Sequence, residues 1–154
     1  MTMHTWFIAK IRYEKTMENG MNKKVTELYL VDALSFTEAE ARIIEEMTRF
    51  ISGEFMVSDL RRANISEIFS SEEENDDKWY KIKIAIATLN EKSGKEKRSY
   101  RYILIQCSDT AKAEAVLHGR MEAALSGYEV IKVEETDIMD VYPYVLAAEN
   151  EETR

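Results

Sequence analysis

The chain repeats itself, and this internal repeat limits its fold more than any other feature. Four pairs of similar residues lie 73 positions apart: Trp6 and Trp79, Ser35 and Ser108, Val57 and Val130, and Phe69 and Tyr142. Gly53 and Gly127 lie 74 apart, which we interpret as one extra residue in the second helix and one fewer just after it. An offset held from the first strand to the last turn predicts two copies of one supersecondary unit.

The first copy is predicted to contain a strand, a strand, a helix and a strand. Apolar and polar residues alternate over residues 5–13, and a returning strand over residues 25–32 follows a turn at Asn19-Gly20. Ser35 and Glu38 have the spacing of a capping box, and Gly53 ends the helix that they begin. A third strand over residues 55–62 and a short helical turn complete the copy. The helix has an apolar stripe of Phe36, Ala39, Ile43, Ile44, Met47, Phe50 and Ile51, and the closing turn contains Ile65, Ile68 and Phe69.

The second copy repeats this order. Strands are predicted over residues 79–89, 99–107 and 128–134, with a turn at Ser93-Gly94. Ser108 is predicted to begin the helix and Gly127 to end it. The buried stripe of this helix is predicted to be Ala113, Val116, Leu117, Met121, Ala124 and Leu125, and Ile138, Val141 and Tyr142 repeat the closing helical turn.

These elements predict an α+β protein built by internal duplication of a β-β-α-β unit. We expect one or two antiparallel sheets with two amphipathic helices packed on one face. The first repeat covers residues 1–69 and the second covers residues 79–144, with an acidic linker at 70–78 and a frayed acidic tail at 145–154. Because a three-stranded unit is marginal by itself, we expect the copies to pair about a pseudo-twofold axis into one compact domain.

Composition narrows the class of protein. The net charge of −8 argues against broad, non-specific binding to nucleic acid, although a local basic patch stays compatible with it. The single cysteine, Cys107, excludes an intramolecular disulfide and is interpreted as a small buried residue. The longest apolar run is too short to cross a bilayer, and the first residues lack the pattern of a secretory signal. We therefore expect a cytoplasmic protein that has no contact with membranes.

The sequence shows no catalytic or metal-binding pattern above background, so no catalytic residue, metal or cofactor is predicted. Of the two histidines, His4 stands alone, and His118 is interpreted as a solvent-facing partner of Glu114 on the second helix. An acidic cluster could hold a hard cation, but it lacks the spaced ligands and turn glycine of a calcium loop. A solvated strand end is the preferred interpretation of its members, Glu134, Glu135, Asp137 and Asp140.

The first strands of the two copies provide the sharpest candidate site. On the face away from the helices, aromatic and cationic residues alternate in phase. Rings that stack on bases and cations that meet phosphates are typical of single-strand binding. The alternative is that both tryptophans cover the core and the cations only keep the face soluble. The candidates are Trp6, Ile8, Lys10 and Arg12 in the first copy and Trp79, Lys81 and Lys83 in the second.

A second candidate is the charged loop predicted between the first two strands, residues 14–24. It contains Met17, Asn19 and Met21, and exposed methionines suit adaptable contacts with other proteins. The alternative is that the two methionines fold back on the sheet.

Two segments, residues 13–20 and residues 29–40, resemble a family of short proteins from anaerobic gut bacteria and their phages. They read Tyr13-Glu14-Lys15-Thr16-Met17-Glu18-Asn19-Gly20 and Tyr29-Leu30-Val31-Asp32-Ala33-Leu34-Ser35-Phe36-Thr37-Glu38-Ala39-Glu40. That family is a domain of unknown function, and the resemblance covers nearly the whole chain. It implies cytosolic expression and a role in phages or mobile elements, and it transfers no catalytic residue. Ile8 and Ala9 depart from the polar or cysteine residues of the family.

Three functions stay open at this point. The first is a non-enzymatic binding protein that contacts another protein or a second copy of itself. The second is a single-stranded nucleic-acid-binding protein that uses the face with Trp6 and Trp79. The third is an enzyme with a site that the sequence does not reveal.

Overall fold

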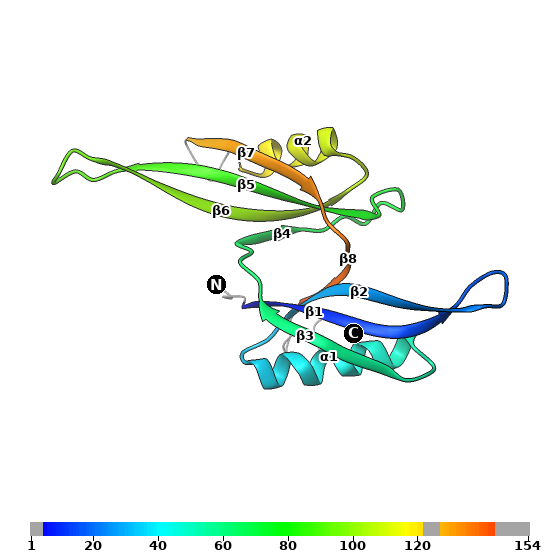
Figure 1. The fold of residues 1–154 in the computed structure, drawn as a ribbon. Helices are drawn as coiled ribbons and strands as arrows, with labels where there is room; N and C mark the ends of the chain where they lie inside the picture. The colour runs from blue at the N-terminus through cyan, green and yellow to red at the C-terminus, as the bar shows by residue number, and fades with distance from the viewer. Residues whose placement is uncertain (1–4, 122–126, 144–154) are drawn as a thin grey trace, which may run out of the picture. The chain divides into compact units, whose positions relative to one another are not determined.

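The computed structural model describes residues 5–121 and 127–143, which form an α+β protein of two compact units. The first unit comprises Met1–Ala63 and Ile138–Arg154, and the second comprises Asn64–Asp137. Each unit has a four-stranded sheet with one helix packed against it (Figure 1). The predicted α+β class is confirmed. No helix in the described residues is long and apolar enough to span a membrane.

The sheet of the first unit has the strand order β3-β1-β2-β8. The long hairpin β1–β2 and the strand β3 are antiparallel, whereas β8 pairs parallel with β2. Helix α1 contacts β1, β2 and β3. The elements are β1 (Trp6–Thr16), β2 (Asn22–Asp32), α1 (Phe36–Phe50), β3 (Phe55–Arg62) and β8 (Ile138–Tyr142).

The sheet of the second unit has the order β4-β6-β5-β7, in which β4 is the parallel strand. Helix α2 contacts β5, β6 and β7. The elements are β4 (Glu67–Phe69), β5 (Lys78–Leu89), β6 (Glu96–Cys107), α2 (Thr110–Met121) and β7 (Tyr128–Glu135).

The closing segments were predicted as helical turns, and this prediction is wrong. Both are strands, and each pairs with a strand of the other sequence repeat: Ile68 opposes Leu104, and Val141 opposes Leu30. An open edge of β2 or β6 would leave backbone donors and acceptors unpaired, and a short extended segment satisfies them. The two units consequently differ from the sequence repeats, because β4 and β8 are exchanged between them.

The pairing registers of the two units correspond residue by residue. Trp6 opposes Asp32 in the first unit, and Trp79 opposes Gln106 in the second. The first and third strands therefore correspond at an offset of 73, whereas the second strands correspond at 74. A bulge follows Lys10 in one unit and Lys83 in the other. The extra residue of the second copy thus lies in its hairpin loop. The glycine spacing had suggested that it lies in the helix, and that interpretation is wrong.

The residues that cap the N-termini of the two helices also lie 74 positions apart. Ser35 caps α1, since its hydroxyl accepts a hydrogen bond from the Glu38 N–H at 3.1 Å. In α2 this position is taken by Asp109, whose carboxylate accepts a hydrogen bond from the Lys112 N–H at 2.8 Å. The prediction that Ser108 begins the second helix is wrong by one residue. The predicted end of this helix before Gly127 falls on residues 122–126, which lie outside the described ones.

Each helix buries a narrower stripe than its sequence predicts. The buried residues are Ala39, Ile43 and Met47 in α1, and Ala113, Leu117 and Met121 in α2. Phe36, Ile44 and Phe50 flank the α1 stripe and are 47%, 41% and 69% exposed. The predicted members Ala124 and Leu125 lie outside the described residues. Two flanking residues still pack at the margin of the core: the ring of Phe36 is 4.9 Å from that of Phe7, and Val116 packs against the core of the second unit.

Candidate functional site

The sheet face opposite α2 has alternating cations and aromatic rings. β5 places Lys81 and Lys83 on this face because Ile82 and Ile84, their neighbours, lie in the core with α2. In β6, Tyr102 is directly opposite Lys83, so alternate residues of that strand share the face. We define the cation–tyrosine face as Lys81, Lys83, Arg98, Tyr100 and Tyr102.

The cations of this face lie over its rings. Lys83 Nζ is 4.5 Å from the centroid of the Tyr100 ring, and Lys81 Nζ is 4.8 Å from that of Tyr102. The Arg98 guanidinium carbon is 5.9 Å from the Tyr100 centroid. Such contacts contribute about 0.5–1 kcal/mol each at exposed sites. Tyr100 is 49% exposed, whereas Tyr102, Lys81 and Lys83 are half-buried.

The cations of the cation–tyrosine face differ in whether a carboxylate forms an ion pair with them. Among the described residues, no carboxylate forms an ion pair with Lys81 or Lys83. Arg98, in contrast, lies 2.8 Å from Glu129 on β7, and Lys132 on the same strand pairs with Glu134 at 3.2 Å. The two lysines therefore lie outside ion pairs beside the tyrosines, although Glu134 on β7 is directly opposite Lys81.

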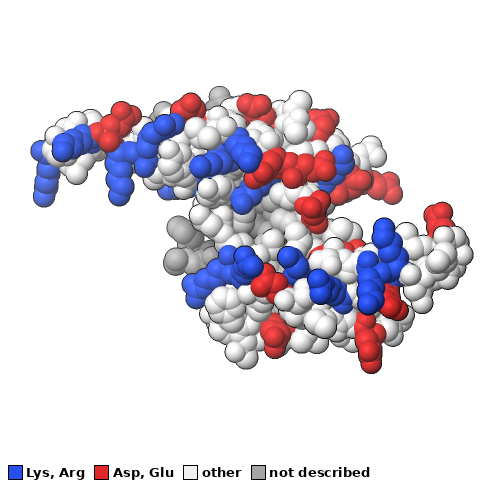
Figure 2. Space-filling model, viewed as in Figure 1, with Lys and Arg blue, Asp and Glu red and all other residues white. Residues whose placement is uncertain are grey.

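The strands around this face form a strongly basic hairpin within an acidic chain. We define the basic hairpin as residues 78–107, which comprise β5, β6 and their connection. Its acidic residues are only Glu91 and Glu96. Lys and Arg side chains gather along this hairpin in Figure 2. The eight cationic residues are Lys78, Lys81, Lys83, Lys92, Lys95, Lys97, Arg98 and Arg101.

The tryptophans predicted to lie on the two helix-free faces are buried. Trp6 is 6% exposed and Trp79 is 3% exposed, so neither ring presents a face to solvent for stacking. In the first unit, Lys10 and Arg12 are exposed and Ile8 is half-buried. The structure thus separates the predicted site residues into buried rings and accessible cations.

The accessible rings, Tyr100 and Tyr102, were missed by the sequence reasoning. Arg98, Tyr100 and Tyr102 occupy every second position, which indicates that they share one face of the sheet. The hairpin register shows that this is also the face of Lys81 and Lys83. Counting charges over residues 78–107, rather than over the whole chain, would also have identified the basic hairpin. The predicted strand began at residue 99, which excluded Arg98.

The tip of the first hairpin is shorter than predicted. Glu14, Lys15 and Thr16 pair with Lys24, Lys23 and Asn22, so the loop is only residues 17–21. Gly20 adopts a φ of 81°, which a turn of this kind requires. The Asn19 side chain accepts a hydrogen bond from the Met21 N–H at 3.0 Å. Met17 and Met21 are 41% and 68% exposed and are therefore available for contacts.

The remaining titratable candidates have structural partners. Cys107 is fully buried, and burial raises the pKa of its thiol. His118 Nε2 is 3.7 Å from Glu114, as predicted, and its Nδ1 is also 2.5 Å from the Tyr128 hydroxyl. His4 lies outside the described residues.

The acidic cluster is divided between the two units. Glu134 and Glu135 form ion pairs with Lys132 and Lys78, both at 3.2 Å, and lie with Asp137 in the second unit. Asp140 belongs to β8 in the first unit. The described part of the chain contains no group of three acidic, histidine or cysteine residues that could hold a metal ion.

Comparison with known proteins places the chain in a family. Residues 5–144 match the domain of unknown function DUF4494, and the chain belongs to this family. No curated protein matches the chain.

Proposed function

We propose that this domain of unknown function binds single-stranded nucleic acid through the cation–tyrosine face and the basic hairpin around it. The observation that supports the proposal is the pairing of Lys81 and Lys83 with the rings of Tyr100 and Tyr102, at 4.5–4.8 Å, on a sheet face without a helix. The protein would act as a binding module and not as an enzyme.

The two residue types have complementary tasks in such a site. Bases of a single strand stack on exposed rings, at about 1–3 kcal/mol per base, and need no defined sequence to do so. Lysine and arginine replace the counterions of the phosphates, which supplies affinity that weakens with salt. Tyr100 and Tyr102 alternate with Arg101 along β6, so each ring can receive one base.

The net charge of −8 does not contradict this proposal, because the charge is unevenly distributed. The basic hairpin has eight cations against two carboxylates, and the surplus of acidic residues lies in the rest of the chain. Acidic surface elsewhere repels phosphates, and we expect it to restrict contact to the hairpin.

Fluorescence anisotropy with labelled single-stranded DNA and RNA tests the proposal. Tyr100→Ala should weaken binding by about 5- to 150-fold, whereas Tyr100→Phe should retain it, because the ring remains. Thr26 occupies the position of Tyr100 in the first unit, so Thr26→Ala is the matched control and should have no effect. Unlabelled duplex should compete less well than single strands. Absence of binding by the wild type, or equal binding by Tyr100→Ala, would contradict the proposal.

Contact with a protein partner or with a second copy is the other candidate, and the exposure of Met17 and Met21 at the first hairpin tip favours it. This activity would depend little on salt, because burial of apolar area would drive it. Sedimentation velocity should then show association that Met21→Ser abolishes. A role in phages or mobile elements, which the family resemblance implies, fits either activity.

A further inference from the structure

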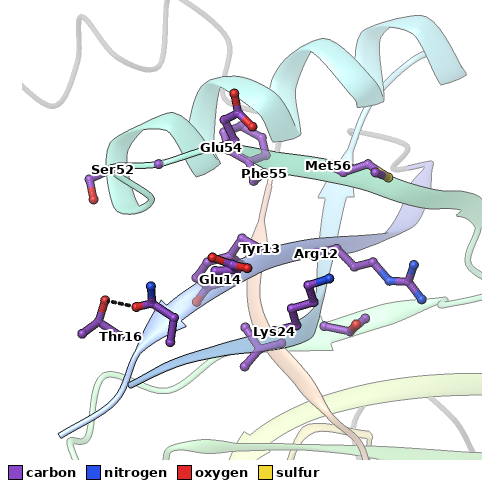
Figure 3. A pocket seen from close by; sticks show the side chains of 13 residues that line it. Arg12, Tyr13, Glu14, Thr16, Lys24, Ser52, Glu54, Phe55 and Met56 are labelled. Atoms are coloured by element: carbon purple, nitrogen blue, oxygen red, sulfur yellow. Dashed lines mark hydrogen bonds between the residues drawn. The ribbon is translucent and has the colours of Figure 1, made fainter. Parts of the chain in front are cut away.

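Each unit has a groove at the start of one edge strand, β3 in the first unit and β7 in the second. The groove of the first unit has a volume of about 1030 Å³, and that of the second has about 510 Å³. In the first unit, β1 pairs with β3 only as far as Tyr13 and Phe55, and β1 then continues to Thr16. The chain that leads into β3 diverges there, and the groove lies between it and the β1–β2 hairpin (Figure 3).

The two grooves occupy equivalent places. All seven residues that line the smaller groove have counterparts, at offsets of 73 or 74, among the thirteen that line the larger one. Tyr128 corresponds to Phe55, for example, and Arg98 corresponds to Lys24. Since the registers of the two sheets also correspond, the grooves belong to the repeated unit and not to an accidental surface.

The charges of the two grooves differ. In the second unit the Arg98 guanidinium is neutralised by Glu129 at 2.8 Å. Met56, which is 59% exposed, replaces that glutamate in the first unit, and Arg12 replaces Ala85. Among the described residues, neither Arg12 nor Lys24 forms an ion pair with a carboxylate. The larger groove therefore has two cations outside ion pairs and two carboxylates, of which Glu14 is directly opposite Lys24. The one cation of the smaller groove, Arg98, is held in an ion pair.

The register places these two cations next to each other. Arg12 is opposite Thr26 and Met56, and Lys24 follows two residues from Thr26 on the same face. In Figure 3, Arg12 and Lys24 extend from the β1–β2 hairpin and Met56 lies across from them on β3. Glu14 is directly opposite Lys24, and Glu54 lies on the segment before β3. Thr16 and Asn22, joined by a hydrogen bond of 2.9 Å, close the outer end.

We propose that the groove of the first unit binds a phosphate ester of nucleotide size. Arg12 and Lys24 would hold the phosphate, because two neighbouring cations match a divalent anion. The carboxylates of Glu14 and Glu54 would accept hydrogen bonds from hydroxyl or amino groups of the same ligand. The volume is at the upper end of the range for small-molecule sites. The groove lies in the first unit, so this proposal is independent of the nucleic-acid proposal for the second.

Isothermal titration calorimetry with AMP and with inorganic phosphate tests the groove. Lys24→Gln and Arg12→Gln should each weaken AMP binding by about tenfold or more, as the loss of a charged hydrogen bond predicts. Lys23→Gln, at the neighbouring exposed position of β2 whose side chain does not line the groove, is the matched control and should leave AMP binding unchanged. Met56→Glu supplies the carboxylate found in the second unit and should abolish binding. Circular dichroism of each variant would show that the fold is intact.

Four results would overturn the proposal. The first is no saturable binding of AMP or phosphate by the wild type, and the second is an equal loss from Lys23→Gln. The third is undiminished binding by Met56→Glu, and the fourth is a response of the groove variants to oligonucleotides alone. The last result would instead make the groove part of a nucleic-acid surface. Because AMP and oligonucleotides are titrated separately, failure of this proposal is distinguishable from failure of the first.

Discussion

The ammonium group of Lys112 in α2 lies 2.5 Å from a carboxylate oxygen of Asp76, a residue that is 4% exposed. Asp76 belongs to the segment predicted as an acidic surface linker, but the Ser71 hydroxyl also donates a hydrogen bond to it at 2.6 Å. The Ser71 N–H in turn donates to the Gln106 side chain at 2.9 Å. The segment before β5 is thus anchored to β6 and α2 by a buried carboxylate.

Because of this anchor, the stability of the second unit should decrease as the pH falls into the acidic range. The hydrogen bonds from Lys112 and then Ser71 lower the pKa of Asp76. The stabilisation by the ionised Asp76 carboxylate should be complete above the pKa of the unfolded state, about 3.9. It should be lost as the pH falls through the lower pKa of the folded state. In urea titrations, Asp76→Asn should be less stable than the wild type at neutral pH, with a difference that shrinks in acid. Asp77→Asn, at an exposed neighbouring position, should have little effect at either pH. A difference that persists in strong acid would show that the carboxylate charge is not responsible.

The cores of the two units should be equally sensitive at equivalent helix positions. Ile43 and Leu117 are both fully buried and lie 74 residues apart. Ile43→Ala and Leu117→Ala should each cost about 2–5 kcal/mol of the free energy of unfolding, because each leaves a cavity. Glu45→Ala on the outer face of α1, where the side chain is 71% exposed, should change the free energy by less than about 0.5 kcal/mol. Chemical denaturation measures all three, and similar effects from all of them would contradict the assigned stripes.

Tyrosines of the first unit should ionise late. Burial, followed by hydrogen bonding to Glu27, raises the pKa of Tyr13 to about 12, and burial raises that of Tyr142 to about 12. The stabilisation from the neutral tyrosines should be complete below the pKa of the unfolded state, about 10. It should be lost as the pH rises through the pKa of the folded state, about 12. An ultraviolet titration should therefore show a late step that Tyr13→Phe reduces. A late step of unchanged size in Tyr13→Phe would contradict the assignment.

Salt should distinguish the lysines of the two helix-free faces. If Lys83 contacts a phosphate, Lys83→Ala should weaken single-strand binding and reduce the slope of log K against log salt by about 1. Lys10 occupies the equivalent position in the first unit, and Lys10→Ala should leave both quantities unchanged if the second unit alone binds the strand. Anisotropy titrations over a range of salt concentrations measure the slope. An equal effect of both substitutions would extend the binding surface to the first unit.

The sequence by itself determined the local elements of this protein. Alternation placed the long strands, Ser35 placed the start of α1, and Asn19-Gly20 placed the first hairpin turn, because these signals depend on neighbours in the chain. The burial of Cys107 also followed from its type and its place at the end of β6. The repeat predicted that the elements would occur twice in the same order.

Only the tertiary structure decided which strands meet. The segments around Ile68 and Val141 are too short to reveal a partner, and they became strands because open edges of β6 and β2 were available. The register of the second hairpin then brought Tyr100 beside Lys83, two residues far apart in sequence. The same register put Met56 and Glu129 at equivalent places, so Arg98 has an ion-pair partner on β7, whereas a methionine occupies the equivalent place relative to Lys24. Contacts across strands depend on pairing and register, and no local pattern along the chain specifies either of them.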